Sequence, residues 1–342
     1  MSDILSMKPD RPLLDVRNLV TEFPVRNGIF RAVNDLSFSI DPGKTLCVVG
    51  ESGSGKSVTA RSILQIIDSP GYIASGSIIL NRADGTSLDL AKLDPRSRAI
   101  RSVRGADIAM IFQEPMSSLS PVHTVGDQIT EVLRLHLKMS KAQARAEAIE
   151  LLRQVEIPNP EKALDRYAFQ YSGGMRQRAM IAMALACGPE LLIADEPTTA
   201  LDVTIQAQIL DLMRGLRRDT GTSIILITHD LGVVAEMADD VAVMYAGQIV
   251  ERAPVRDLFA RPEHPYTVGL LGSIPRLDEK RERLPSIEGR VPDMSRPPDG
   301  CRFAARCPFV EPACRVETPP LIEVAPGHLT RCRRAPLAQV LA

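Results

Sequence analysis

The chain has 342 residues, which is enough for one large domain or two ordinary ones. Its 41 Lys and Arg residues nearly balance 42 Asp and Glu residues. It therefore lacks the bulk positive field that holds nucleic acid or an anionic membrane without specificity. With 44% hydrophobic and 24% charged residues, the composition is that of a folded globular protein and excludes global disorder.

The N-terminal region lacks the basic stretch and the apolar core of a signal peptide. No segment approaches the run of roughly 18 apolar residues that marks a transmembrane helix. We therefore expect the protein to remain in the cytoplasm and to reach a membrane only through a partner that spans it.

Seven apolar runs bounded by Gly, Pro, Asp or Asn predict β-strands. Three of them, TLCVV, LLIAD and SIILI, are almost continuously apolar, which is typical of parallel strands covered by helices on both faces. The sequence therefore predicts an α/β fold with a mixed or parallel sheet as its core. The predicted strands span residues 14–20, 36–40, 45–49, 108–112, 191–194, 224–228 and 241–245.

Two regions depart from this strand and helix alternation. Between about 115 and 170 helix formers dominate, so we expect an α-helical subdomain inserted into the core. Half of the 26 prolines lie after residue 261, where the alternation stops. We therefore divide the chain into a first domain, 1–260, and a separate small C-terminal extension, 261–342, rich in Pro and Cys.

A glycine-rich loop follows the predicted strand at 45–49 and leads into a predicted helix. Its sequence, GESGSGKS, has the G-x-x-x-x-G-K-[ST] spacing of a phosphate-binding loop. Glycines let backbone N–H groups point at phosphates, Lys56 reaches the β and γ phosphates, and the Ser57 hydroxyl is a Mg²⁺ ligand. A plain glycine-rich turn is the alternative, but the flanking strand and helix favour nucleotide binding. The predicted nucleotide contacts are Gly50, Glu51, Ser52, Gly53, Ser54, Gly55, Lys56, Ser57 and Val58.

Two acidic residues end the predicted strand LLIAD. Asp195 is placed to orient Mg²⁺, and Glu196 is placed to polarise the water that attacks the γ phosphate. The next strand ends at His229, at the same sheet edge, where ligands bind in open α/β folds. Such acids alone are more often a solvated strand end, but the phosphate loop upstream favours catalysis, with His229 contacting the γ phosphate.

A second anion-binding segment, YSGGM, precedes the predicted helix RAMIAMALA. Ser172, Gly173 and Gly174 lie at the N-terminus of that helix, where free N–H groups favour a phosphate. This segment cannot serve the same phosphate as Lys56 without competing with it. Two anion cradles in one chain therefore suggest that two chains act together.

Taken together, these segments resemble the ATP-binding-cassette (ABC) family of P-loop NTPases over about residues 13–255. They follow the family order: phosphate loop, Gln113 of a Q-loop, YSGGM, ADEP, the D-loop TALD from Thr199 to Asp202, and His229. The resemblance implies a head-to-tail dimer of cassettes with two ATP molecules at the interface. Each ATP is then held by the phosphate loop of one chain and the signature segment of the other.

The resemblance also assigns roles to single residues. Gln113 joins Ser57 and Asp195 as a Mg²⁺ ligand, and an aromatic ring stacks on adenine, with Phe23 as the candidate and Phe30 as the alternative. The usual signature is LSGGQ, so Tyr171 and Met175 are departures, whereas the Ser-Gly-Gly that faces phosphate is intact. Further residues implied to bind nucleotide are Tyr171, Ser172, Gly173, Gly174 and Asp202.

Flanking segments separate the branches of the family. Chromosome-maintenance members insert a very long coiled coil before the signature, and translation-type members carry two cassettes in one chain; neither feature occurs here. The segments FQEPMSSLSP and RPEHPYT, with the Cys-rich tail, resemble the ATPases of dipeptide and oligopeptide importers. Nickel importers and some sugar importers share this extension and are the nearest alternatives.

This resemblance implies an ATPase subunit that powers a bacterial dipeptide or oligopeptide importer, peripheral on the cytoplasmic face of the inner membrane. The implied partners are a second, related but different ATPase subunit, two permease subunits and, through these, an extracytoplasmic solute-binding protein. We expect no nucleic-acid partner. Two other classes stay open: a soluble mechanochemical ATPase acting on DNA or ribosomes, and a regulatory module that binds ATP without turnover.

Four cysteines in the tail form the last candidate site: Cys301, Cys307, Cys314 and Cys332. No C-x₂-C pair occurs, so an ordinary zinc ribbon fits poorly, whereas four thiolates suit a [4Fe–4S] cluster. Nearby arginines would offset the negative charge of the cluster, and the family resemblance supports the same cofactor. Structural Zn²⁺ and a metal-free tail are the alternatives.

Two further expectations concern the separation of these sites. Because Lys56 and Ser57 lie in the first domain, we expect ATP binding to be independent of the cysteine tail. Cys47 and Cys187 lie in apolar runs, and we expect both to be core residues.

Overall fold

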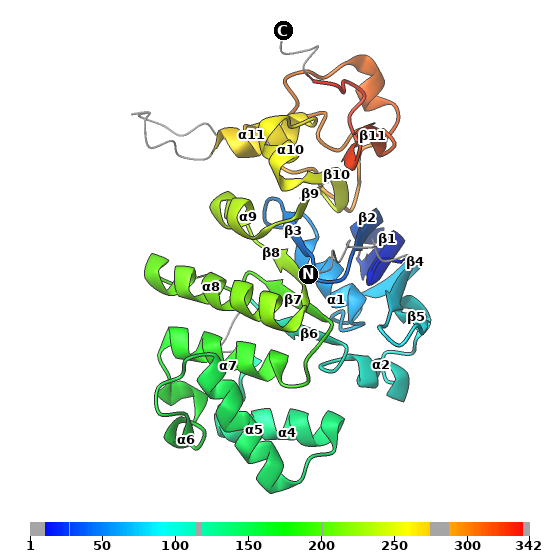
Figure 1. The fold of residues 1–342 in the computed structure, drawn as a ribbon. Helices are drawn as coiled ribbons and strands as arrows, with labels where there is room; N and C mark the ends of the chain where they lie inside the picture. Colours follow the sequence, from blue (N-terminus) through cyan, green and yellow to red (C-terminus); the bar gives the residue numbers. More distant parts are fainter. Residues whose placement is uncertain (1–10, 27, 114–117, 200, 274–286, 338–342) are drawn as a thin grey trace, which may run out of the picture.

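Two β-sheets of unequal size form the frame of the molecule (Figure 1). The structure, a computed structural model, describes residues 11–26, 28–113, 118–199, 201–273 and 287–337. In this part of the chain the larger sheet has the strand order β11-β12-β10-β9-β3-β8-β7-β6, and the smaller has the order β2-β1-β4-β5.

Parallel strands form the centre of the larger sheet, and their residues face two cores. In β3, Cys47 and Val49 pack toward the helices, whereas Leu46 and Val48 pack toward the smaller sheet. The prediction of a parallel sheet covered on both faces is thereby confirmed. The strands are β3 (Thr45–Val49), β6 (Ile108–Ile111), β7 (Leu191–Asp195), β8 (Ser223–Ile227) and β9 (Asp240–Tyr245).

The smaller sheet is antiparallel and covers one face of the larger sheet. Its strands are β1 (Leu14–Val25), β2 (Gly28–Ile40), β4 (Tyr72–Asn81) and β5 (Ser87–Asp89). Neither β4 nor β5 was among the predicted strands. The first half of β4 is largely exposed, so its sequence lacks the apolar alternation that marks a half-buried strand.

Helices cover the other face, and three of them form the predicted helical subdomain at one end of the molecule (Figure 1). Capping boxes explain where its two longer helices begin: Thr124 and Ser140 each accept an N–H and are closed by Asp127 and Gln143. The subdomain contains α4 (Val125–Leu137), α5 (Lys141–Gln154) and α6 (Pro160–Ala163). The same face carries α7 (Gly173–Leu185), α8 (Val203–Thr220) and α9 (Leu231–Met237), whereas α1 (Lys56–Ile63) and α2 (Arg98–Val103) pack on the side of the smaller sheet.

Short 3₁₀ turns complete the chain at η1 (Leu90–Lys92), η2 (Ala168–Gln170) and η3 (Pro312–Arg315). Among the helices of the described ranges, none has both the length and the apolar character needed to cross a bilayer.

The C-terminal extension continues the larger sheet, at the end opposite the helical subdomain (Figure 1). Strand β12 pairs with β10 in antiparallel register, with Glu251 opposite Thr330. The extension therefore shares a β-sheet with the core. The division at residue 260 itself remains a prediction. The first domain ends with β10 (Gln248–Pro254) and α10 (Val255–Ala260), and the extension contains α11 (Pro265–Gly272), β11 (Ile322–Ala325) and β12 (His328–Thr330).

Candidate active site

The glycine-rich loop connects β3 to α1 at the carboxyl edge of the parallel strands. Glycine is required at two of its positions. A Cβ on Gly50 would lie 2.1 Å from the carbonyl oxygen of Met244, and a Cβ on Gly55 would lie 2.4 Å from that of Ala32. Both glycines also have positive φ angles, 152° and 99°. The loop is therefore seated against the backbone behind it, with the N-terminus of α1 at its end.

Lys56 folds back across this loop. Its Nζ donates to the carbonyl oxygens of Gly50 at 2.8 Å and Glu51 at 3.0 Å. Burial lowers the pKa of Lys56, and the carboxylates of Glu196, Asp195 and Glu51 oppose that shift. An ammonium group held in this way is available to a phosphate that enters the loop.

Ser57 and Asp195 meet beside Lys56. The Ser57 hydroxyl donates to Oδ1 of Asp195 at 3.1 Å. Burial raises the pKa of Asp195, the hydrogen bond from Ser57 lowers it, and the neighbouring Glu196 raises it further. Mg²⁺ prefers oxygen ligands and is commonly held by one or two protein groups together with substrate phosphates. A hydroxyl and a carboxylate at this spacing fit that donor set.

Glu196 directly follows Asp195 in the chain, and its backbone is in the left-handed region with φ 47°. Its Oε2 accepts hydrogen bonds from Nε2 of Gln113 at 3.1 Å and from the Thr199 hydroxyl at 2.9 Å. The other oxygen lies 3.5 Å from Nδ1 of His229, whose side chain is 66% exposed. The carboxylate is therefore oriented from three sides.

The structure thus brings together residues from four predicted segments, though not always in the expected pairing. Gln113 hydrogen-bonds Glu196 and not the Ser57–Asp195 pair, so its role as a Mg²⁺ ligand stays a prediction. Thr199 was expected only as part of the D-loop, and its hydrogen bond to Glu196 was not predicted, because a threonine after a strand end carries no distinctive signal. The part of the Q-loop at 114–117 and Ala200 of the D-loop lie outside the described residues.

The signature segment starts α7 and faces outward. Ser172 caps the helix by accepting the N–H of Met175 at 3.3 Å, and Ser172 and Gly173 are exposed. Tyr171 points inward instead: it is buried and donates its hydroxyl hydrogen to the Ala163 carbonyl at 2.9 Å. Burial raises the pKa of Tyr171 to about 12. The departure from Leu at this position is therefore accommodated by the core, away from the exposed Ser-Gly-Gly.

The D-loop residue Asp202 caps α8 by accepting the N–H of Ile205 at 2.9 Å. The next residue, Val203, is an apolar side chain left 84% exposed. The described end of the D-loop is therefore on the surface, where a second chain can reach it.

Both candidate adenine-stacking residues lie in the β1–β2 hairpin, where Phe23 pairs with Phe30. The Phe23 ring lies over Gly71, so close that a Cβ there would be 2.4 Å from the ring. Phe30 is partly buried against the helical-side core. The stacking of Phe23, or alternatively Phe30, on adenine stays a prediction.

The four tail cysteines come together around one small cavity of about 20 Å³. The pKa of Cys332 is raised to about 11, mainly by burial and also by the three other cysteines, against a lowering by the backbone N–H of Arg334. Among the described residues, however, no three His, Cys, Asp or Glu side chains are close enough to hold a metal ion. The described residues therefore do not support the expected [4Fe–4S] cluster. Of the other two cysteines, Cys47 is buried as expected and Cys187 is only half-buried.

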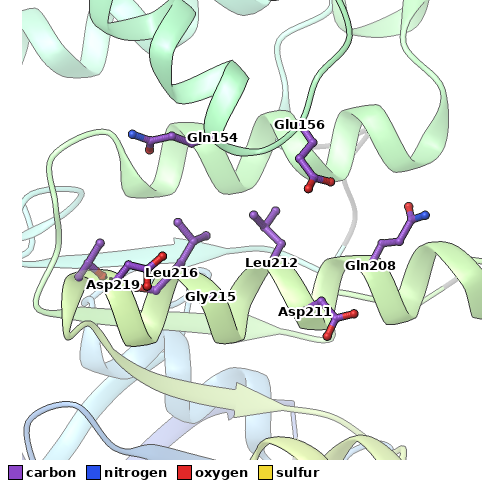
Figure 2. Close-up of a pocket in the computed structure, with 9 residues that line it drawn as sticks. Gln154, Glu156, Gln208, Asp211, Leu212, Gly215, Leu216 and Asp219 are labelled. Atoms are coloured by element: carbon purple, nitrogen blue, oxygen red, sulfur yellow. Dashed lines mark hydrogen bonds between the residues drawn. The ribbon is translucent and has the colours of Figure 1, made fainter.

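A larger open groove lies elsewhere, between α8 and the end of α5 (Figure 2). Its volume is about 550 Å³, and none of its lining residues comes from the phosphate loop or from the strand ends beside it. Asp211 in its wall is paired with Arg214. This groove is therefore not the nucleotide site.

Comparison with known families gives two matches within the chain. Residues 33–199 match the ABC transporter family, and residues 250–314 match the family described as the oligopeptide/dipeptide transporter C-terminal region. The second match contains the RPEHPYT segment and three of the four tail cysteines, Cys301, Cys307 and Cys314.

Similar proteins span almost the whole chain. A Brucella melitensis protein named as a peptide import ATP-binding protein is 52% identical, over 95% of this chain and 97% of its own length. A Sinorhizobium fredii protein named as a peptide ABC transporter ATP-binding protein is 53% identical, over 94% and 95%. A solved dimeric bacterial ABC transporter cassette is 25% identical with a TM-score of 0.63, over 71% of this chain and 99% of that one.

Proposed function

The chain belongs to the ABC transporter family of ATP-binding proteins, and from this premise we propose that it hydrolyses ATP to power a bacterial importer of dipeptides or oligopeptides. The peptide cargo is supported by the names of its relatives and by the C-terminal region that it shares with oligopeptide and dipeptide transporters. The observation that carries the ATPase activity is the meeting of Lys56, Ser57, Asp195 and Glu196 at one sheet edge.

Each of these residues has one task in the proposed reaction. Lys56 binds the β and γ phosphates and neutralises charge that develops there. Ser57 and Asp195 hold Mg²⁺, which supplies electrostatic stabilisation of the phosphoryl group when bound. Glu196 orients the attacking water, and Gln113, Thr199 and His229 keep its carboxylate in place.

Two cassettes act together in this proposal. Ser172 and Gly173 are exposed at the N-terminus of α7, a suitable cradle for the ATP held by a second chain. Exposed Val203 at the D-loop supports the same contact. ATP then joins the two chains, and Glu196-assisted hydrolysis separates them. We expect the second cassette to be a related but different chain.

A groove beside the Q-loop is the proposed docking site for the permeases. It has a volume of about 290 Å³, and its walls include Ile66, Val132 and Met183. Phe112 in its wall is partly exposed and directly precedes Gln113, which contacts Glu196. An amphipathic helix from a cytoplasmic permease loop suits this apolar groove. The chain would thus sit at the cytoplasmic face of the inner membrane, below two permeases and an external solute-binding protein.

The cofactor of the cysteine cavity is proposed to be a [4Fe–4S] cluster. The four thiols line one cavity, and a single Zn²⁺ would require them to converge at about 2.3 Å from one point. A cluster spreads four thiolates over a larger volume, and Arg333 and Arg334 in the cavity wall would offset its negative charge. Structural Zn²⁺ is the alternative outcome of an anaerobic metal analysis.

Uptake by reconstituted vesicles tests the function. The chain is purified together with the membrane proteins that accompany it, and this complex is reconstituted into lipid vesicles. The solute-binding protein is added on the opposite side from the cassettes, and ATP on the cassette side. We expect ATP-dependent uptake of a labelled dipeptide or oligopeptide. Uptake of Ni²⁺ but no peptide would refute the cargo. Copurification with DNA or ribosomes in place of membrane proteins would refute the transporter assignment.

A further inference from the structure

We propose that the C-terminal extension positions the phosphate loop, with Tyr266 and Arg306 as positioning residues for ATP binding. The inference rests on the proposed ATPase function and assigns a task to two residues outside the nucleotide motifs. It also accounts for the His-Pro-Tyr segment, which the proposed reaction does not use.

Glu51, the second residue of the phosphate loop, is held by the extension at two points. Its backbone N–H donates to the Tyr266 hydroxyl oxygen at 2.9 Å. Its carboxylate accepts two hydrogen bonds from Arg306, from Nη1 at 2.8 Å and from Nη2 at 3.0 Å. Paired donors and acceptors of this kind fix orientation as well as distance.

Arg306 is itself immobilised. Its side chain is only 5% exposed, and it also donates to the carbonyl oxygens of Ile287 and Glu288, each at 2.9 Å. The guanidinium carbon lies 5.7 Å from the ring centre of Tyr245 and 5.9 Å from that of Phe303. The ion pair with Glu51 is therefore unlike an exposed surface pair, whose partners move and are screened by salt.

Tyr266 is fixed by the start of α11. Pro265 takes the first helical position, and Nδ1 of His264 accepts the Tyr266 N–H at 3.1 Å. His264 is buried, and burial lowers its pKa to about 3, so the ring stays neutral and keeps its acceptor nitrogen. The Tyr266 ring packs 4.7 Å from Tyr245 and 5.5 Å from Phe303, centre to centre. Each residue of the segment thereby helps to direct one hydroxyl at the loop.

A third contact holds the far side of the loop. The Gly247 N–H, from the β9–β10 turn, donates to the Ser54 carbonyl oxygen at 2.9 Å. Arg302 of the extension donates to the carbonyl of the preceding residue, Ala246. The phosphate loop is thus supported near both of its ends by groups that bind no phosphate.

We expect these contacts to affect the affinity for ATP more than the rate of the hydrolysis step. A loop of Gly and Ser loses much conformational entropy when it orders around phosphates. Contacts that order it beforehand remove part of that cost, equally for bound ATP and for the transition state. Their loss is then expected to raise KM with little change in kcat, which distinguishes positioning from catalysis.

The test uses the full chain with Arg306→Ala, Glu51→Gln and the double variant, together with Tyr266→Phe. Arg261→Ala is the matched control, because Arg261 lies in the same extension but is 69% exposed and pairs with Asp257 on the surface. We measure the Kd of MgATP, KM and kcat. We expect Kd and KM to rise about tenfold in Arg306→Ala and Glu51→Gln, and less in Tyr266→Phe.

The double variant decides whether the two residues act as a pair. If they do, its Kd matches that of either single variant, because the interaction is already lost. The inference would be overturned if the double variant raised Kd by the product of the two single effects, or if Kd were unchanged in all variants. Tyr266→Phe keeps the test valid if Arg306→Ala does not fold. Because Kd needs no turnover, it decides the positioning role in every case, whereas an inactive wild-type chain would count only against the proposed ATPase function.

Discussion

Gln113 and Glu196 join the ends of two neighbouring strands, with Nε2 of Gln113 donating to Oε2 of Glu196 at 3.1 Å. Gln113 also follows Phe112, which lines the apolar groove that we assign to the permeases. The consecutive residues Phe112 and Gln113 therefore connect the proposed docking surface to Glu196, the residue that orients the attacking water.

Gln113→Ala should weaken this connection. We expect ATP binding close to that of the wild type and peptide uptake reduced about tenfold or more, because the motion is no longer transmitted to the permeases. Uptake and ATP binding are measured on the same vesicles, with Gln154→Ala, at the edge of the unrelated groove in Figure 2, as the control. Unchanged uptake would show that Gln113 is only structural.

Ser172→Arg tests the cradle offered to a second chain. Its long cationic side chain would occupy the N-terminus of α7, so hydrolysis at the phosphate loop of the partner should be abolished. Nucleotide binding by the isolated subunit should remain, because that site is built from Lys56 and its neighbours. Loss of ATP binding by the isolated subunit would mean that the segment serves its own chain.

The sequence predicted most of this site because its signals are local. The phosphate loop, the acidic strand end and the signature each lie within a few residues, and buried parallel strands are continuously apolar. The contact of Arg306 with Glu51 spans 255 positions and leaves no local pattern. The pairing of β12 with β10 was missed for the same reason, because three residues, His328–Thr330, are too short to be read as a strand.

Cys307→Ser should remove the proposed cluster. Anaerobically purified wild-type protein should carry about four iron atoms per chain, and the variant none. Arg306 is adjacent to Cys307 and binds Glu51 of the phosphate loop. We therefore expect the KM for ATP to rise in this variant as well, whereas the sequence alone predicted that ATP binding is independent of the cysteine tail. Cys187→Ser, half-buried and outside the cavity, is the control. Stoichiometric zinc without iron in the wild type would replace the cluster by a structural zinc site.

His264 should make the protein sensitive to acid. Burial holds its folded-state pKa at about 3, below the unfolded value near 6.5. Its neutral form is therefore favoured in the folded state. The contribution of His264 to the free energy of unfolding is fully present above about pH 6.5 and decreases by about 1.4 kcal/mol per pH unit as the pH falls toward 3. His264→Asn, which keeps a capping acceptor, should show a flatter dependence of unfolding free energy on pH. Equal slopes would contradict this origin.

The most direct measurement is ATP turnover by Glu196→Gln beside MgATP binding by the same preparation, with Glu236→Gln, a surface carboxylate paired with Arg214, as the control. Gln keeps the size of the side chain but cannot polarise water as a carboxylate does. We predict unchanged ATP affinity, accumulation of the ATP-bound dimer, and turnover lower by about 10²-fold or more. Turnover near that of the wild type would contradict the assignment of Glu196 and the mechanism built on it.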